Sequence, residues 1–256
     1  MPPGAASTPL EAGRWWLVLP AAGFGRRMRS DTPKQYMGIG GRSVLDLTIS
    51  RFIGLPGLAG IVLIAAPDAS PEAVGAVDAG EVPVRLVAGG ATRAESVRNG
   101  LAVFRERWGE LAPGAESADG LGEWVMVHDA ARPCVRPADV RRLLEAASGP
   151  DGALLTAPVR DTIKRVDGAG RVAATVDRRA LVHALTPQLF PAGVVLAALE
   201  QAATAGRQVT DESSALEWAG LSPRAVEGGA DNLKITHPED IAIAEAVLRQ
   251  QGVLDD

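Results

Sequence analysis

Residues 15–28 read WWLVLPAAGFGRRM, and PKQ follows at residues 33–35. An apolar run that ends in small residues and two glycines is typical of a buried strand followed by a loop. Glycines in such a loop let main-chain N–H groups approach a phosphate closely. Arg27 and Lys34 add cations to this cradle. The stretch therefore predicts a strand and a loop that together suit a triphosphate.

Other interpretations fit parts of this loop. The dinucleotide-binding fingerprint needs a third glycine, and Met28 occupies its place. Asp46 lies where that fold puts a ribose-binding acid, but inside a helical pattern. The P-loop pattern needs Gly-Lys-Ser or Gly-Lys-Thr, which the sequence lacks. A plain glycine turn with solvated basic residues remains the simplest alternative when the loop is taken alone.

Short apolar runs alternate with longer amphipathic stretches along the chain. This alternation predicts an α/β fold, with a mostly parallel sheet and helices on both faces. Ligands of such sheets bind beyond the carboxyl ends of the strands. We expect strands at residues 15–20, 60–66, 82–87, 124–127 and 152–157, and helices at residues 43–53 (with Ser43 as the N-cap), 71–77, 92–107 and 137–147. Residues 109–122 are expected to form a surface loop.

A β-hairpin is predicted where this alternation is interrupted. Residues 162–166 and 171–176 are two short β-like runs joined by Asp-Gly-Ala-Gly. A lone hairpin is marginally stable in water. We therefore expect this one to lean on another surface, such as a second subunit.

Three further motifs stand at or near predicted strand ends. In HDAARP, residues 128–133, Asp129 suits a magnesium ion beside phosphates, or caps the next turn. Arg132 suits binding of the phosphate of a second substrate, or it forms a surface ion pair. In GGATRAES, residues 89–96, the main chain suits a base edge, or forms a plain turn. Lys234 stands in a short apolar run, which favours a lysine directed at a ligand or a carboxylate.

The composition argues against several classes of protein. The chain of 256 residues has a formal net charge of −5, which disfavours general nucleic-acid binding. Its one cysteine, Cys134, allows no internal disulfide and suits the cytoplasm. We expect no membrane span, because the sequence has no apolar run of about 18 residues. Residues 1–13, rich in Pro, Ala, Gly and Ser, are expected to be a disordered tail, and residues 14–256 a single domain.

Further motifs are APVRDT-K at residues 157–164, VDR at 176–178, ALTPQ at 184–188, TDE at 210–212 and ADNLKIT at 230–236. With the motifs above, their order and spacing resemble those of the methylerythritol phosphate cytidylyltransferase family, from Trp15 to Leu248. The resemblance implies a three-layer Rossmann-like fold with a protruding β-hairpin arm, at about residues 158–180, that joins two subunits. It also implies that methylerythritol phosphate attacks the α-phosphorus of CTP, with Mg²⁺ present, and that pyrophosphate leaves.

The resemblance assigns roles residue by residue. It makes Arg27, Lys34, Arg178 and Lys234 catalytic, and it places the metal at Asp129. It assigns binding of the acceptor phosphate to Arg132, Thr162, Arg178 and Thr210, and it implies that Thr162 and Arg178 reach the site of the partner subunit. It assigns CTP binding to Ala21, Ala22, Gly23, Gly25, Gly90, Arg93, Ser96 and Ala130.

Ala91 departs from the family, which often has an acidic residue there. The alternatives are a ribitol 5-phosphate cytidylyltransferase or a related sugar-phosphate nucleotidyltransferase, a dinucleotide-dependent oxidoreductase, and a nucleotide-binding module without catalysis.

Overall fold

The computed structural model describes residues 8–9, 13–23, 33–66, 77–106 and 123–255. The predicted loop at residues 109–122 lies outside these ranges, as do nearly all of the predicted helix at 71–77 and most of the predicted tail. Within the described ranges, no helix combines the length and the apolar character that crossing a membrane requires.

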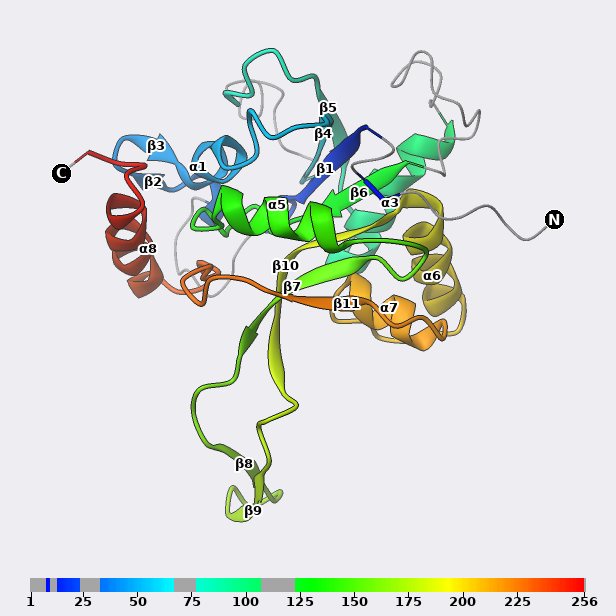
Figure 1. Ribbon diagram of the computed structural model, residues 1–256, viewed down its shortest axis with the longest axis vertical. Coiled ribbons are helices and arrows are strands. Elements are labelled where there is room, and N and C mark those ends of the chain that lie inside the picture. Colours follow the sequence, from blue (N-terminus) through cyan, green and yellow to red (C-terminus); the bar gives the residue numbers. More distant parts are fainter. Residues whose placement is uncertain (1–7, 10–12, 24–32, 67–76, 107–122, 256) are drawn as a thin grey trace.

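A seven-stranded sheet forms the centre of the fold, in the order β11-β7-β10-β6-β1-β4-β5 (Figure 1). Strands β6, β1, β4 and β5 run parallel to one another, and β11 runs parallel to β7. Only β10 is reversed, and it pairs antiparallel with both β6 and β7. The sheet is therefore mostly parallel, as the alternation predicts. The strands are β1 (Trp15–Pro20), β4 (Leu58–Ala65), β5 (Val84–Ala88), β6 (Trp124–Val127), β7 (Ala153–Pro158), β10 (Val182–Pro191) and β11 (Arg224–Glu227).

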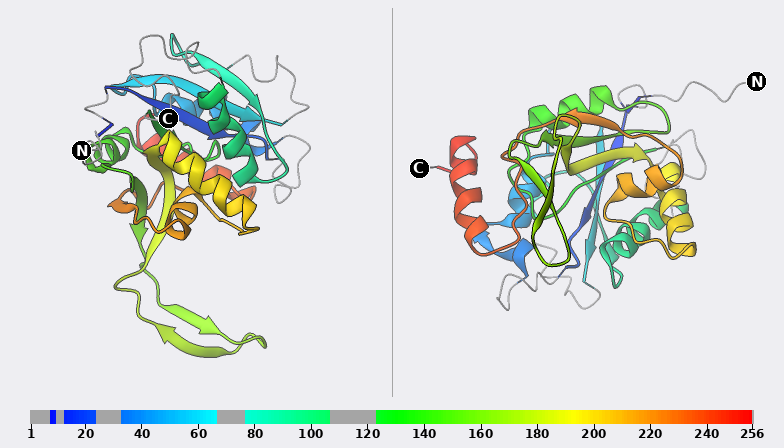
Figure 2. Two further views of the ribbon diagram at one scale, coloured as in Figure 1. Left: turned by 90° about the vertical axis from the view of Figure 1, so that its right-hand side faces the viewer. Right: turned by 90° about the horizontal axis from the view of Figure 1, so that it is seen from below.

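Helices cover both faces of this sheet, which makes three layers (Figure 2). Side chains alternate along β1, so that Trp15 and Leu17 pack on the side of α1 and α5, while Trp16 and Val18 pack on the side of α3, α6 and α7. Ser43 caps α1 as predicted, because its Oγ accepts the Asp46 N–H at 3.0 Å. The helices are α1 (Val44–Ser50), α3 (Arg93–Glu106), α5 (Pro137–Ala146), α6 (Ala192–Thr204) and α7 (Glu212–Trp218).

A third apolar cluster fastens the C-terminal segment to the sheet domain. Helix α8 (Glu239–Gln250) packs there with α1 and with the small hairpin of β2 (Gly38–Ile39) and β3 (Arg42–Ser43). Ile235 belongs to this cluster, and its N–H donates to the Ala131 carbonyl at 2.8 Å. The segment that carries Lys234 is thereby held beside the loop that follows β6.

The predicted hairpin is present and extends away from the sheet as an arm (Figures 1 and 2). It consists of β8 (Ile163–Val166) and β9 (Val172–Val176), which pair antiparallel. In the single chain Val166 is 56% exposed and Val172 is 63% exposed. The arm thus presents apolar side chains that its own chain does not cover.

Candidate active site

A cavity of about 560 Å³ opens at the carboxyl ends of the parallel strands. The loops after β1, β5 and β6 meet there, which is where α/β sheets bind ligands. Every described residue that the resemblance assigns to CTP lines this cavity, namely Ala21, Ala22, Gly23, Gly90, Arg93, Ser96 and Ala130. Lys34, Asp129 and Lys234 line it as well. Gly25 and Arg27 lie outside the described residues.

One wall of this cavity depends on close packing between the loops after β1 and β5. A Cβ atom at Gly89 would lie 2.4 Å from the Ala22 Cβ, so only glycine fits there. Ser96 Oγ accepts the Gly90 N–H at 3.0 Å and donates to the Thr92 carbonyl at 2.8 Å. The turn between β5 and α3 is therefore fixed by its own hydrogen bonds. At the departure from the family pattern, the Ala91 N–H donates to Glu95 Oε2 at 2.8 Å.

Asp129 lies at the centre of a cluster of cations. Arg93 Nε donates to its Oδ1 at 3.1 Å, while Arg132 Nε and Lys234 Nζ lie 3.1 and 3.0 Å from its Oδ2. Burial by itself would raise the pKa of this carboxyl group, but the charges of Arg93, Lys234 and Arg132 outweigh burial and hold the pKa well below its usual range. Asp129 is thus ionised at neutral pH, and the four side chains together carry an excess of positive charge that suits phosphates.

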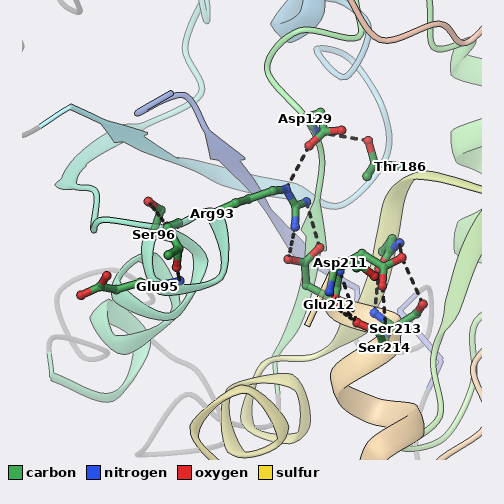
Figure 3. Close-up of polar contacts among 12 residues, drawn as sticks. Arg93, Glu95, Ser96, Asp129, Thr186, Asp211, Glu212, Ser213 and Ser214 are labelled. Carbon is green, nitrogen blue, oxygen red and sulfur yellow. Dashed lines mark hydrogen bonds and ion pairs between the residues drawn. The ribbon is translucent and has the colours of Figure 1, made fainter. Parts of the chain in front are cut away.

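Glu212 holds Arg93 from the opposite side. The two carboxylate oxygens accept Arg93 Nη1 and Nη2 at 2.7 and 3.0 Å, and Figure 3 shows the guanidinium between Glu212 and Asp129. Burial lowers the pKa of Arg93, but Glu212 and Asp129 raise it above its ordinary value. The motif at residues 210–212 is visible in the sequence, yet the role of Glu212 is not, because its partner lies 119 residues away.

A second cavity of about 240 Å³ adjoins the first. The two cavities share Arg93, Asp129 and Lys234 as a common wall. Arg132 and Thr210, both assigned to the acceptor phosphate, line the smaller of these two cavities and not the larger. The cation cluster therefore stands between a nucleotide-sized chamber and a smaller chamber, where two anionic substrates would meet.

His128 is fully buried behind this cluster. Its Nε2 lies 3.1 Å from the Arg132 carbonyl oxygen and its Nδ1 lies 3.0 Å from Thr186 Oγ1. A carbonyl oxygen only accepts, so Nε2 carries the hydrogen and Nδ1 accepts from the Thr186 hydroxyl. Burial lowers the pKa of His128 to about 3, and the ring is neutral. Both ring nitrogens are thus engaged within the protein, which gives His128 a structural role.

Lys34 lines the larger cavity. It begins the short 3₁₀ helix η2 (Lys34–Tyr36), and its Nζ donates to the Ile235 carbonyl at 2.8 Å. The next residue, Gln35, is buried and donates to the Ala21 carbonyl at 2.6 Å. These two contacts fix the PKQ motif between the end of β1 and the segment that carries Lys234.

Thr162 and Arg178 line neither cavity of the single chain. Both are exposed in the stems that join the arm to the sheet, where Arg178 Nη1 donates to the Arg160 carbonyl. The structure therefore brings together the described site residues of the sheet domain and leaves the two arm residues apart from them.

Residues 15–250 match the family model of 2-C-methyl-D-erythritol 4-phosphate cytidylyltransferase. The chain belongs to this family. The enzyme of that name from Ectopseudomonas mendocina is 49% identical over 230 residues, which cover 90% of this chain and 93% of the relative. The Pseudomonas aeruginosa PAO1 enzyme of the same name is 49% identical over 228 residues, which cover 89% of this chain and 93% of that one.

Solved structures of the family share the fold. A 4-diphosphocytidyl-2C-methyl-D-erythritol synthase is 34% identical with a TM-score of 0.73, covering 92% of this chain and 99% of that one. The 2-C-methyl-D-erythritol 4-phosphate cytidylyltransferase from Thermus thermophilus is 30% identical with a TM-score of 0.71, also covering 92% and 99%. These likenesses confirm the family, and with it the Rossmann-like architecture, that the motifs indicate.

The cytidylyltransferase resemblance also implies a magnesium ion at Asp129, so the residues there must leave room for a metal ion. No group of three or more His, Cys, Asp or Glu side chains among the described residues is placed to hold a metal. A carboxylate offers about four lone-pair sites, and the three cations leave one of them on Asp129 Oδ1. The site thus fits a Mg²⁺ held mainly by phosphate oxygens and water, which is a common arrangement for this ion at nucleotides.

Proposed function

We infer that this protein transfers the cytidylyl group of CTP to 2-C-methyl-D-erythritol 4-phosphate, giving 4-diphosphocytidyl-2-C-methyl-D-erythritol and pyrophosphate for isoprenoid precursor synthesis. The observation that carries this proposal is the wall of Arg93, Asp129 and Lys234 shared by the two cavities. It gives a nucleotide and a smaller phosphate one meeting point. A dinucleotide-dependent oxidoreductase has no need of such a wall between two anion chambers.

The chemistry requires charge stabilisation more than proton transfer. An oxygen of the acceptor phosphate is already an anion, so it attacks the α-phosphorus without a general base. A P–O bond forms there as the bond to the bridging oxygen of pyrophosphate breaks. Lys34 and Lys234 line the cavity in which this charge develops, and we assign them, with Arg27, to its stabilisation. When bound, Mg²⁺ would neutralise charge on the CTP phosphates, with Asp129 as its protein ligand.

We propose that the arm completes the acceptor chamber of a partner subunit. The single chain supplies Arg132 and Thr210 to that chamber but leaves Thr162 and Arg178 exposed in the stems of the arm. A homodimer in which each arm reaches the other subunit would bring Thr162 and Arg178 to the acceptor phosphate. It would also cover Val166 and Val172, which are exposed here.

We also propose that residues 14–256 act as a single nucleotidyltransferase domain in the cytoplasm. The match to the family model spans residues 15–250. The only cysteine, Cys134, is buried and unpaired, which suits a reducing compartment.

The experiment that tests this function is pyrophosphate release from CTP and Mg²⁺ with two acceptors. Release with methylerythritol phosphate and little with ribitol 5-phosphate is the expected result. Preference for ribitol 5-phosphate would keep the CTP site but overturn the acceptor. No release with either acceptor, from a folded protein that binds CTP, would leave only nucleotide binding.

A further inference from the structure

Behind the cation cluster, four residues close a ring of hydrogen bonds. Thr186 Oγ1 bonds to His128 Nδ1 at 3.0 Å, and the Thr186 carbonyl accepts Asn232 Nδ2 at 2.8 Å. The Asn232 carbonyl accepts Arg132 Nη1 at 2.7 Å, and the Arg132 carbonyl bonds to His128 Nε2 at 3.1 Å. The ring joins three segments that are far apart in the sequence, at residues 128–132, 186 and 232. It therefore sets where the side chains beside it can point.

Within this ring, Asn232 is the residue that influences the positions of two cations, Arg132 and Lys234. Its carbonyl receives Arg132, which lines the smaller cavity. Two residues further on, Lys234 pairs with Asp129 and lines both cavities. Among the described residues the Asn232 side chain makes one hydrogen bond, from Nδ2 to the Thr186 carbonyl, and this bond ties Asn232 to β10. Loss of the amide would release the Asn232 main chain from β10, and the side chains of Arg132 and Lys234 would then be held less firmly.

The Asn232 amide is not explained by stability alone. The residue is 2% exposed, and its Oδ1 is buried without a hydrogen-bond partner among the described residues. A buried acceptor left unpaired is unfavourable, so the unpaired Oδ1 offsets the stability that the Nδ2 hydrogen bond contributes. Because Oδ1 is shielded from solvent, a substrate cannot reach it either. What remains for the side chain is the bond that Nδ2 makes.

We propose that Asn232 is a positioning residue for cytidylyl transfer, which acts through Arg132 and Lys234 without touching a substrate. This inference rests on the proposed function. It predicts an effect on the acceptor and on turnover that is larger than the effect on KM for CTP, because most of the CTP cradle, at residues 21–23 and 90–96, lies outside the ring. Residues that orient the groups of an active site typically contribute roughly 10–100-fold to activity.

The test is the steady-state kinetics of Asn232→Leu, measured by pyrophosphate release with each substrate varied in turn. We expect kcat/KM for the acceptor to fall roughly 10–100-fold, while KM for CTP stays within about threefold. The change exchanges one unpaired buried acceptor, Asn232 Oδ1, for another, the Thr186 carbonyl. The unfolding temperature should therefore move by less than about 5 °C.

The matched control is Thr156→Val. Thr156 is also buried, and it donates one side-chain hydrogen bond to a main-chain carbonyl, that of Val226, away from the ring. Near-normal kinetics of this control, with the loss confined to Asn232→Leu, would support the proposal. An equal loss in both variants, an equal rise in KM for CTP, or wild-type kinetics of Asn232→Leu would overturn it.

If Asn232→Leu fails to fold, Asn232→Ser and Asn232→Ala take its place. They differ by one oxygen, and only serine offers a donor toward the Thr186 carbonyl. The serine variant should retain more turnover with the acceptor, and equal activity of the two would refute the role of the donor. A wild-type protein without pyrophosphate release would instead refute the proposed function itself.

Discussion

Replacement of His128 by glutamine should remove a pH dependence that this buried imidazole imposes on stability. Burial lowers the pKa of His128 to about 3 in the folded protein, against 6.5 for an exposed imidazole. As the pH falls from 7 to 5, the unfolded chain takes up a proton here that the folded chain refuses. The free energy of unfolding should therefore fall by about 2 kcal/mol over this interval because of His128 alone.

The contribution of His128 is complete above pH 6.5 and is lost progressively as the pH falls toward 3. Urea unfolding at pH 5, 6 and 7, without nucleotide or metal, measures it in both proteins. Glutamine does not titrate, so the variant should lose about 2 kcal/mol less than the wild type between pH 7 and pH 5. All other groups are shared, and they cancel in the comparison. Equal losses in the two proteins would refute a neutral, buried His128.

Three further experiments test Lys34, Glu212 and the arm. Lys34→Ala should stay folded and lose roughly 10²–10³-fold in turnover, as when one oxyanion contact is removed; near-normal pyrophosphate release would contradict its role. Glu212→Gln should lower the free energy of unfolding by about 3 kcal/mol, because Arg93 loses a fully buried ionic partner; a loss below about 1 kcal/mol in urea titrations would refute the estimate. Arg178→Ala and Lys234→Ala, each nearly inactive alone, should on mixing recover about one quarter of the wild-type sites, the expectation for random pairing in a two-fold dimer; no recovery after verified subunit exchange would argue against an arm that serves the partner.

Several elements of the fold can be predicted from the sequence alone. The apolar runs at β1, β4 and β6, the cap at Ser43 and the turn between β8 and β9 depend on residues close together in the chain. Such local patterns determine the period of an element and where it begins, so they can be predicted before any packing is known. The glycine loop and the later motifs indicate the family for the same reason.

Strand β10 shows where local patterns fail. It contains Pro187, and its buried residues Thr186 and Gln188 are polar, so it does not resemble the interior strand that it forms. The proline falls where the pairing with β7 is interrupted between Ala184 and Gln188. The polar side chains are paired through bonds such as Gln188 Nε2 to Asp211 Oδ2 at 2.8 Å. Only the neighbouring strands and loops make this segment stable as a strand.

The same distinction between local patterns and long-range contacts applies to the site. The sequence by itself determines that glycines and cations follow the first strand, because they are contiguous in it. The tertiary structure alone decides that Arg93 spans Asp129 and Glu212, and that Asn232 closes a ring with His128. These contacts depend on buried charges and amides that need partners from distant segments. No spacing in the sequence encodes which segment supplies them.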